Sequence, residues 1–223
     1  MILISEKEKF FDPRKPFQSA RPETHEEWQA RMGGEVLAVV RSGLYLDFRF
    51  LDQALSALTP TADERCGVLA TDGTILCYQP SALLRLYQKN PKYLNRLYIH
   101  TVFHCIFRHL WLRGKRDKRL WDLACDIAVE NVIDGLGRKS VQRPLTWVRQ
   151  HAYEEIIAQE KVAAAAPVYR WLVRQTPGVL RQLEKEFYTD DHRLWPKDAP
   201  EQPQQMPAPM PQKTWQKIGE RMQ

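Results

Sequence analysis

The chain has 223 residues, 43% of them hydrophobic, and a net charge of +6 at pH 7, which suits one globular domain with a tail. It has no run of about 18 apolar residues and becomes charged from Glu6 onward, which argues against a membrane-spanning helix and a secretory leader. Its basic residues are spread out apart from residues 113–119, so nucleic-acid binding is disfavoured and a cytoplasmic protein with no membrane partner is expected.

The N-terminal part of the sequence predicts an arm and then the start of a single domain. Residues 1–22 are polar, contain three prolines and are predicted to form an N-terminal arm. Thr24 and Glu27 have the spacing of a capping box, so a helix is expected to begin there. We place the domain at 23–195, followed at 196–223 by a proline-rich linker and the start of a further C-terminal domain.

The domain is predicted to be mainly α-helical, of the α+β class, with one short β-hairpin next to a helix that carries two histidines. The β-prone runs 67–70 and 74–78 flank Asp72-Gly73, a dipeptide typical of tight hairpin turns. The other periodic runs predict helices at 24–40, 50–58, 80–88, 91–112, 119–133, 145–162, 168–175 and 177–187.

The four cysteines are Cys66, Cys77, Cys105 and Cys125, and no two of them form a C-x-x-C pair. A zinc knuckle or disulfides are the alternatives. The apolar surroundings favour four buried thiols, and this is the state we predict.

His100 and His104 form the most informative pattern in the sequence. At i and i+4 in an apolar helix, two imidazoles lie on one side of the helix about one turn apart. In the zinc-binding motif H-E-x-x-H a Glu follows the first His and acts as general base, but here that position is Thr101. Arg108 falls on the same strip, whereas His109 is expected about 140° away from His104 on a continuous helix.

A second polar stripe lies on the next predicted helix, where four acids follow at i+4 spacing: Asp122, Asp126, Glu130 and Asp134. Because a short loop joins the two helices, they are expected to be antiparallel neighbours with the stripes facing each other. Two imidazoles, one carboxylate and an open position for water make a catalytic zinc site, and a second carboxylate can orient a ligand histidine. The residues alone leave two alternatives open, a buried hydrogen-bonded His pair and a solvated acidic face.

These patterns occur in an order that resembles a known family, over roughly residues 30–223. The family is the N-terminal metallopeptidase (zincin-like) domain of bacterial proteins that carry a C-terminal von Willebrand factor A-like domain. The segments that carry the resemblance are ATDG…YQP at 70–80, IHTVFH at 99–104 with His109, LWDLACDIAVE at 120–130, and DDHRLW at 190–195.

The resemblance implies a zincin-like core in which His100, His104 and Asp126 bind zinc. The family pattern has Glu where this chain has Thr101, and a Thr hydroxyl cannot replace a carboxylate base near neutral pH. Glu130 is then the candidate base, and whether the chain is an enzyme stays open. The polar groups expected around the site are Asp122, His192 and Arg108, with a surface loop position as the alternative for His192.

Two functions follow from this resemblance. The first is zinc-dependent hydrolysis of peptide bonds. The alternative is a catalytically inactive module, a pseudoenzyme with the metallopeptidase fold. Such a module would bind a peptide or protein segment along the hairpin edge, or work with the C-terminal domain of the same chain and an AAA-type ATPase. The residue that separates these two functions is Thr101.

Overall fold

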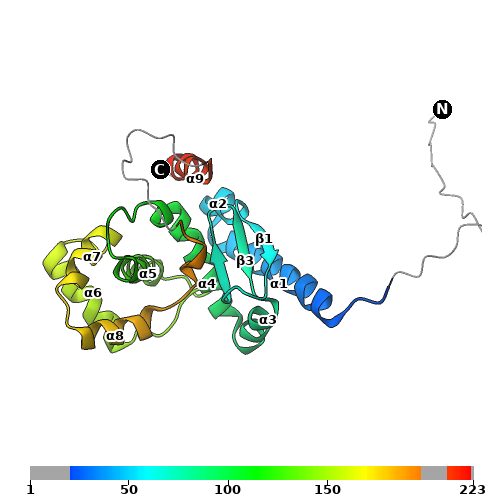
Figure 1. The fold of residues 1–223 in the computed structure, drawn as a ribbon, viewed down its shortest axis with the longest axis horizontal. Helices are drawn as coiled ribbons and strands as arrows, with labels where there is room; N and C mark the ends of the chain where they lie inside the picture. Colours follow the sequence, from blue (N-terminus) through cyan, green and yellow to red (C-terminus); the bar gives the residue numbers. More distant parts are fainter. Residues whose placement is uncertain (1–20, 197–209, 222–223) are drawn as a thin grey trace, which may run out of the picture.

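The computed structural model describes residues 21–196 and 210–221. The predicted arm at 1–22, apart from its last two residues, and most of the predicted linker lie outside these residues. The described part is mainly helical with one small sheet, as predicted (Figure 1). Its elements are α1 (His25–Asp47), η1 (Arg49–Leu51), α2 (Asp52–Ser56), β1 (Thr59–Ala62), β2 (Leu69–Thr71), β3 (Ile75–Tyr78), α3 (Pro80–Lys89), α4 (Pro91–Ile106), η2 (His109–Trp111), α5 (Lys118–Gly135), α6 (Trp147–Glu160), α7 (Ala165–Val173), α8 (Pro177–Phe187), η3 (His192–Leu194) and α9 (Met210–Arg221).

Side-chain caps fix where the main helices begin. Thr24 Oγ1 accepts a hydrogen bond from the Glu27 N–H, and the Glu27 carboxylate accepts one from the Thr24 N–H, which is the predicted capping box. Asn90 caps α4, and Asp117 caps α5 by accepting from the Leu120 N–H. The starts of α4 and α5, the helices that carry the two polar stripes, are therefore set by local sequence.

The predicted hairpin is confirmed by the antiparallel pairing of β2 with β3. At its turn, Asp72 Oδ1 accepts hydrogen bonds from the backbone N–H groups of Thr74 and Ile75. Gly73 has φ of 91°, a left-handed conformation that glycine adopts without a Cβ clash. The Asp-Gly pair thus forms the tight turn that the sequence predicts.

The sheet has a third strand that was not predicted. The strand β1 pairs in parallel with β3, so the sheet order is β1-β3-β2. This strand has only four residues, all exposed, and includes Pro60. Proline is tolerated on an edge strand, where its missing N–H interrupts no ladder. Because β1 shows no alternation of apolar and polar residues, no sequence signal marked it.

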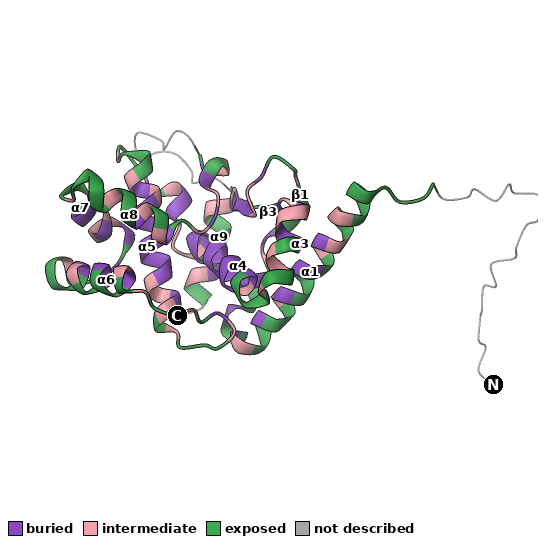
Figure 2. Ribbon diagram, turned by 90° about the horizontal axis from the view of Figure 1, so that it is seen from below, coloured by how far each residue is buried: buried purple, intermediate pink, exposed green. Residues whose placement is uncertain are grey.

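Helix α4 lies at the centre of the molecule (Figure 2), and its apolar residues belong to one of two large hydrophobic clusters, while α5 contributes to both. One cluster joins α4 to α1, α2 and the sheet, and the other is built from α5, α6, α7 and α8. In Figure 1, α6, α7 and α8 lie around α5, and all four helices are on the opposite side of α4 from the sheet. From Leu97 to Cys105 every α4 residue is buried, including both histidines of the first stripe.

The helix α9 packs against α4 and α2. Its Trp215 is buried, and the Trp215 indole N–H donates to the Gly73 carbonyl at the hairpin turn, 2.8 Å away. The described C-terminal residues therefore contribute to the same hydrophobic core as α1, α4 and the sheet. No helix within the described ranges is both long and apolar enough to cross a membrane.

The prediction of four buried thiols was wrong for one pair. Cys66 and Cys77 form a disulfide, with their Cα atoms 6.6 Å apart, while Cys105 and Cys125 remain buried thiols. Cys66 precedes β2 and Cys77 lies on β3, so folding of the hairpin brings these two sulfurs together. Sequence spacing alone does not show this, since the pairing depends on the register of the hairpin.

Candidate metal centre

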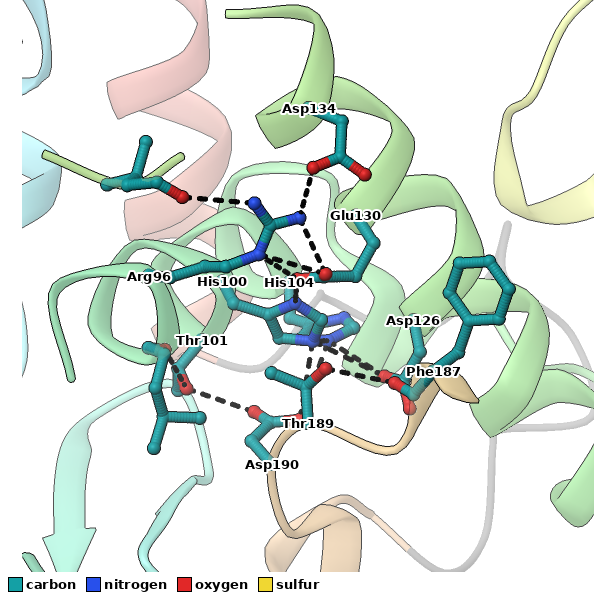
Figure 3. Close-up of polar contacts among 12 residues, drawn as sticks. Arg96, His100, Thr101, His104, Asp126, Glu130, Asp134, Phe187, Thr189 and Asp190 are labelled. Carbon is teal, nitrogen blue, oxygen red and sulfur yellow. Dashed lines mark hydrogen bonds and ion pairs between the residues drawn. The ribbon is translucent and has the colours of Figure 1, made fainter. Parts of the chain in front are cut away.

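Helices α4 and α5 bring the two predicted stripes together. The Nε2 atoms of His100 and His104 lie 2.8 Å apart (Figure 3). Asp126 Oδ1 lies 3.4 Å from His100 Nε2 and 3.3 Å from His104 Nε2. All three side chains are buried. The antiparallel helix pair therefore directs two imidazoles and one carboxylate at a common point.

A fourth group, Asp190, joins this cluster from the segment after α8. Its Oδ1 lies 3.6 Å from His100 Nε2 and 3.7 Å from His104 Nε2. One ligand atom from each of His100, His104, Asp126 and Asp190 lies within 4.8 Å of the others. Sequence reasoning did not include Asp190 among the ligands. The only signal was its place in the segment DDHRLW, which contributed to the resemblance but had no assigned role.

Two observations indicate that the residues of the cluster fit a metal ion. Asp126 Oδ1 and Asp190 Oδ1 are buried and have no hydrogen-bond partner among the described residues, although buried polar atoms are nearly always satisfied. The five distances given above run from 2.8 to 3.7 Å. They bracket the ~3.3 Å between ligands of a tetrahedral ion with bonds of ~2.0–2.1 Å. A cation is therefore the group that would satisfy both carboxylates.

His192 lies against the same cluster. Its Nε2 is 2.8 Å from Asp190 Oδ1 and 3.1 Å from Asp126 Oδ1, yet makes a hydrogen bond with neither. The ring stacks on Trp195, with centroids 3.7 Å apart. Its Nδ1 is 3.9 Å from Asp122 Oδ1. His192 is thus held beside the two carboxylates and gives the cluster a third imidazole.

Glu130, the candidate base, lies on the other side of the His100 ring. Its Oε1 is 2.8 Å from His100 Nδ1, and its carboxylate also accepts hydrogen bonds from Arg96 and Arg149. Both arginines are also paired with Asp134, as Figure 3 shows for Arg96. When the His100 ring is neutral, a hydrogen bond from its Nδ1–H to Glu130 leaves Nε2 without a proton and available as a ligand. Glu130 is therefore placed to orient the His100 ring. Its carboxylate does not face the point on which the four atoms of the cluster converge.

Thr101 occupies the position of the Glu in the H-E-x-x-H pattern. Its hydroxyl lies 3.0 Å from the Leu97 carbonyl and 3.0 Å from Asp190 Oδ2. Thr101 is fully buried, so its hydroxyl is engaged within the protein. Asp190, from the segment after α8, therefore places a carboxylate next to position 101, where the motif normally supplies one.

Two expectations based on a continuous helix were wrong. The α-helix ends at Ile106, and Arg108 adopts the left-handed conformation with φ of 59°. The chain therefore turns back, and His109 Nδ1 lies 3.0 Å from His104 Nδ1, although it was predicted to point away from that ring. Arg108 leaves the histidine strip and instead lines a hollow of about 510 Å³ beside Trp215 of α9.

The charges of the cluster shift its titration in the metal-free protein. Burial would lower the pKa of His192, but Asp126 and Asp190 raise it to about 10. Burial also opposes protonation of His100, yet three carboxylate contacts raise the pKa of His100 well above its usual value. Burial lowers the pKa of His104 to about 4. Although burial acts in the opposite direction, the charged His192 and the other histidines lower the pKa of both Asp126 and Asp190. These two carboxylates are therefore ionised near neutral pH.

A cleft of about 750 Å³ leads from the surface to one side of the cluster. Its lining includes Asp126, Asp190 and His192 of the cluster, together with Asp122. Lys118 pairs with Asp122, so this carboxylate is partly neutralised. The other residues around the cleft are Asp117, Arg119, Leu123, Glu184, Tyr188, Asp191 and Arg193.

The fold and the site define a class of protein: a mainly helical domain with a buried cluster of histidines and aspartates that could hold a metal ion. Comparison with protein families agrees with this class, because the family model described as "Putative metallopeptidase domain" matches residues 40–175, more than half of the chain. The chain belongs to this family. The matched span contains His100, His104 and Asp126 but ends before Asp190 and His192. No match was found among curated proteins or among solved structures.

Proposed function

We propose that the chain is a zinc-binding domain of the metallopeptidase type that works as a binding module without hydrolytic activity. The ion would be held by four protein ligands: His100, His104, Asp126 and Asp190. Imidazole and carboxylate ligands in a tetrahedral arrangement are suited to zinc. A catalytic zinc site keeps one position open for water, whereas four protein ligands fill a tetrahedral site.

The observation that carries this proposal is the contact between Thr101 and Asp190. The residue at the position of the general base has no carboxylate, and its hydroxyl is hydrogen bonded inside the protein. A second carboxylate that faces the histidines, beside that of Asp126, belongs instead to Asp190, where it fills the fourth position. This chain therefore lacks both the base in its motif and the open coordination position that hydrolysis needs.

The remaining acids do not replace that base. Glu130 is buried and its oxygens are occupied by His100, Arg96 and Arg149. Asp122 is paired with Lys118 and lies beyond His192 from the histidine pair. As partners of the module, we retain a peptide or protein segment, a further domain of the same chain, and an AAA-type ATPase.

Metal analysis of the purified protein tests this function. We expect about one zinc per chain, reduced to a small fraction in His104→Ala. His151→Ala is the matched control, because His151 is half-exposed on α6 and lies outside the cluster. Peptide-library assays of the zinc-loaded protein should show no cleavage above a chelated sample. Zinc-dependent cleavage by the wild-type protein would contradict the proposal of an inactive module.

The cleft that reaches Asp126, Asp190 and His192 favours a second candidate, a hydrolase that uses Asp190 as its base. Zinc, when bound, would activate water and polarise a carbonyl group. Asp190 would accept a proton from the attacking water while Thr101 holds its other oxygen. Asp190→Asn separates the two functions. A ligand role predicts weaker zinc binding in this variant, whereas a base role predicts retained zinc and lost cleavage.

A further inference from the structure

Residues 188–195, which we call the strap, cover one edge of the sheet. The strand β2 pairs with β3 on one side, and on its other side Ala70 forms a parallel bridge with Asp191. The Asp191 N–H donates to the Leu69 carbonyl, 3.0 Å away. The Asp191 carboxylate accepts from the Gly67 N–H at 3.0 Å. The strap therefore occupies hydrogen-bonding groups of β2 that would otherwise form an open sheet edge.

The strap approaches the hairpin so closely that a glycine is required opposite it. A Cβ added at Gly67 would lie 2.9 Å from the Asp191 Cβ and 3.1 Å from its Oδ2. These distances are shorter than van der Waals contact, and the Asp191 Cβ cannot move without its backbone. A side chain at position 67 would therefore push the strap away from β2.

Asp190 and His192 are carried into the cluster by the strap. The Asp190 side chain is fully buried and that of His192 is 7% exposed. Asp190 Oδ1 and His192 Nε2 are among the buried atoms that have no hydrogen-bond partner in the described part of the chain. Burying such groups is unfavourable unless they are paired or bind a metal. Outside the cluster, the strap is held by the single backbone bridge to β2, by side-chain contacts of Asp191 and Arg193 with the segment before β2, and by the buried Trp195.

We propose that the strap is docked by the metal ion and lifts from β2 when the ion leaves. This inference rests on the proposed metal centre. Asp126 is fixed on α5 and Asp190 on the strap, so an ion bound to both carboxylates ties the strap to the helical core. Without the ion, the tie between Asp126 and the strap is reduced to the His192 imidazole, which lies 3.1 Å from Asp126 Oδ1 and 2.8 Å from Asp190 Oδ1 without a hydrogen bond to either, so the strap is held less firmly. Binding of the ion and docking of the strap then favour each other by linkage.

The lifted strap would change what the protein exposes. The outer edge of β2 would present unpaired backbone groups, which can pair with an extended segment. Withdrawal of Asp190 would open the fourth position at His100, His104 and Asp126. The strap thus couples access to the metal centre with access to the sheet edge.

Hydrogen exchange on the full chain tests this coupling without any activity assay. We expect protection of the Asp191 amide to fall at least about tenfold when zinc is removed by a chelator. Amides of α7, which lies away from the cluster, serve as the internal reference. Equal protection of Asp191 with and without zinc would overturn the proposal.

A pair of glycine variants tests the same coupling from the hairpin side. Gly67→Ala changes no metal donor, but by lifting the strap it should weaken zinc binding at least about tenfold, as outer positions around metal sites do. Gly43→Ala is the matched control, since a Cβ there would meet no described atom within 4 Å. Zinc affinities would be measured by competition with a chromophoric chelator, and circular dichroism would check the fold.

The outcomes separate this proposal from the proposed function. If the wild type binds no zinc, both fail. If the wild type binds zinc stoichiometrically but Asp191 protection does not respond and Gly67→Ala binds zinc normally, only the strap proposal fails. If Gly67→Ala does not fold, the exchange experiment on the wild type still decides the matter.

Discussion

Thr101 Oγ1 lies 3.0 Å from Asp190 Oδ2, a contact between residues 89 positions apart. Thr101 sits one residue after the first histidine of the pair, on the buried helix α4. Asp190 comes from the strap and faces the same two imidazoles with its other oxygen. The contact links the departure at Thr101 to a carboxylate from outside the helix motif, because a longer acidic side chain at position 101 would compete for the space that Asp190 occupies.

Replacing Thr101 with Val should weaken both the fold and zinc binding. Val has a similar shape but no hydroxyl, so Asp190 Oδ2 would lose the hydrogen bond from Thr101 while still buried. Leaving a buried acceptor unpaired costs about 1–3 kcal/mol. We expect a loss of this size in the free energy of unfolding measured with urea, together with lower zinc affinity.

Thr61→Val is the matched control for this experiment, because Thr61 lies on the exposed strand β1. Surface changes of this kind usually alter stability by about 0.5 kcal/mol or less. An unchanged zinc affinity in Thr101→Val would show that Asp190 does not depend on Thr101.

Glu130→Gln should destabilise the protein as a whole. The neutral amide can still accept a hydrogen bond from His100, but Arg96 and Arg149 would lose a buried opposite charge. Removing one partner from a buried ion pair costs about 3–5 kcal/mol. Thermal unfolding of the metal-free variant should show this loss.

The matched control is Glu184→Gln, which removes the partner of Arg119 at the surface. An exposed pair of this kind contributes about 0–1 kcal/mol. A stable Glu130→Gln variant with altered turnover alone would support a catalytic role for Glu130 in place of the structural one assigned here.

Zinc binding should strengthen as pH rises and should release protons. Carboxylate contacts raise the pKa of His100 well above its usual value against the effect of burial, which favours the imidazolium form with its additional proton in the metal-free protein. An imidazole must lose that proton to bind a metal. Affinity should therefore rise about tenfold per pH unit for each proton displaced. Calorimetry in buffers of different ionisation enthalpy measures the number of protons released, and a pH-independent affinity would contradict the shifted His100 pKa.

Titration of His192 should affect the stability of the metal-free fold with the opposite sign. The carboxylates Asp126 and Asp190 raise the pKa of His192 to about 10 against burial, from a usual value of 6.5. Its protonation thus stabilises the fold fully below pH 6.5, and this contribution is lost as pH rises towards 10. Unfolding of the chelated protein between pH 6.5 and 10 should therefore show falling stability, whereas zinc-loaded protein should not follow that trend.

The parts of the site that sequence could predict are those with local periodicity. His100, His104 and Asp126 lie on two amphipathic stripes, and the spacing within each stripe places them on one helix face. Asp190 belongs to no such stripe and reaches the cluster through long-range folding of the strap. The position of His109 could not be inferred, because the end of α4 at Ile106 is not marked by glycine or proline and depends on a left-handed Arg108.

The same distinction applies to the fold. The hairpin has a turn signal in Asp72-Gly73, and the helices have caps and apolar periodicity, so their existence was predictable. The strand β1 is short, exposed and contains Pro60, and its pairing with β3 depends on the rest of the sheet. The disulfide between Cys66 and Cys77 likewise follows from hairpin register, which the spacing of cysteines does not encode.

A carboxylate introduced at position 101 should support hydrolysis only when Asp190 is removed. In Thr101→Glu alone, the new carboxylate would be buried against Asp190, and two like charges there should destabilise the fold. In Thr101→Glu combined with Asp190→Ala, the fourth position is vacated and a base stands one residue after the first histidine. A positioned base contributes about 10²–10⁴-fold to rate.

Zinc-dependent cleavage of a fluorogenic peptide library should therefore rise by about that factor in the double variant relative to Asp190→Ala, which is the matched control. Equal rates in the two variants, with zinc bound in both, would show that more than the base and the open position separates this chain from an active peptidase.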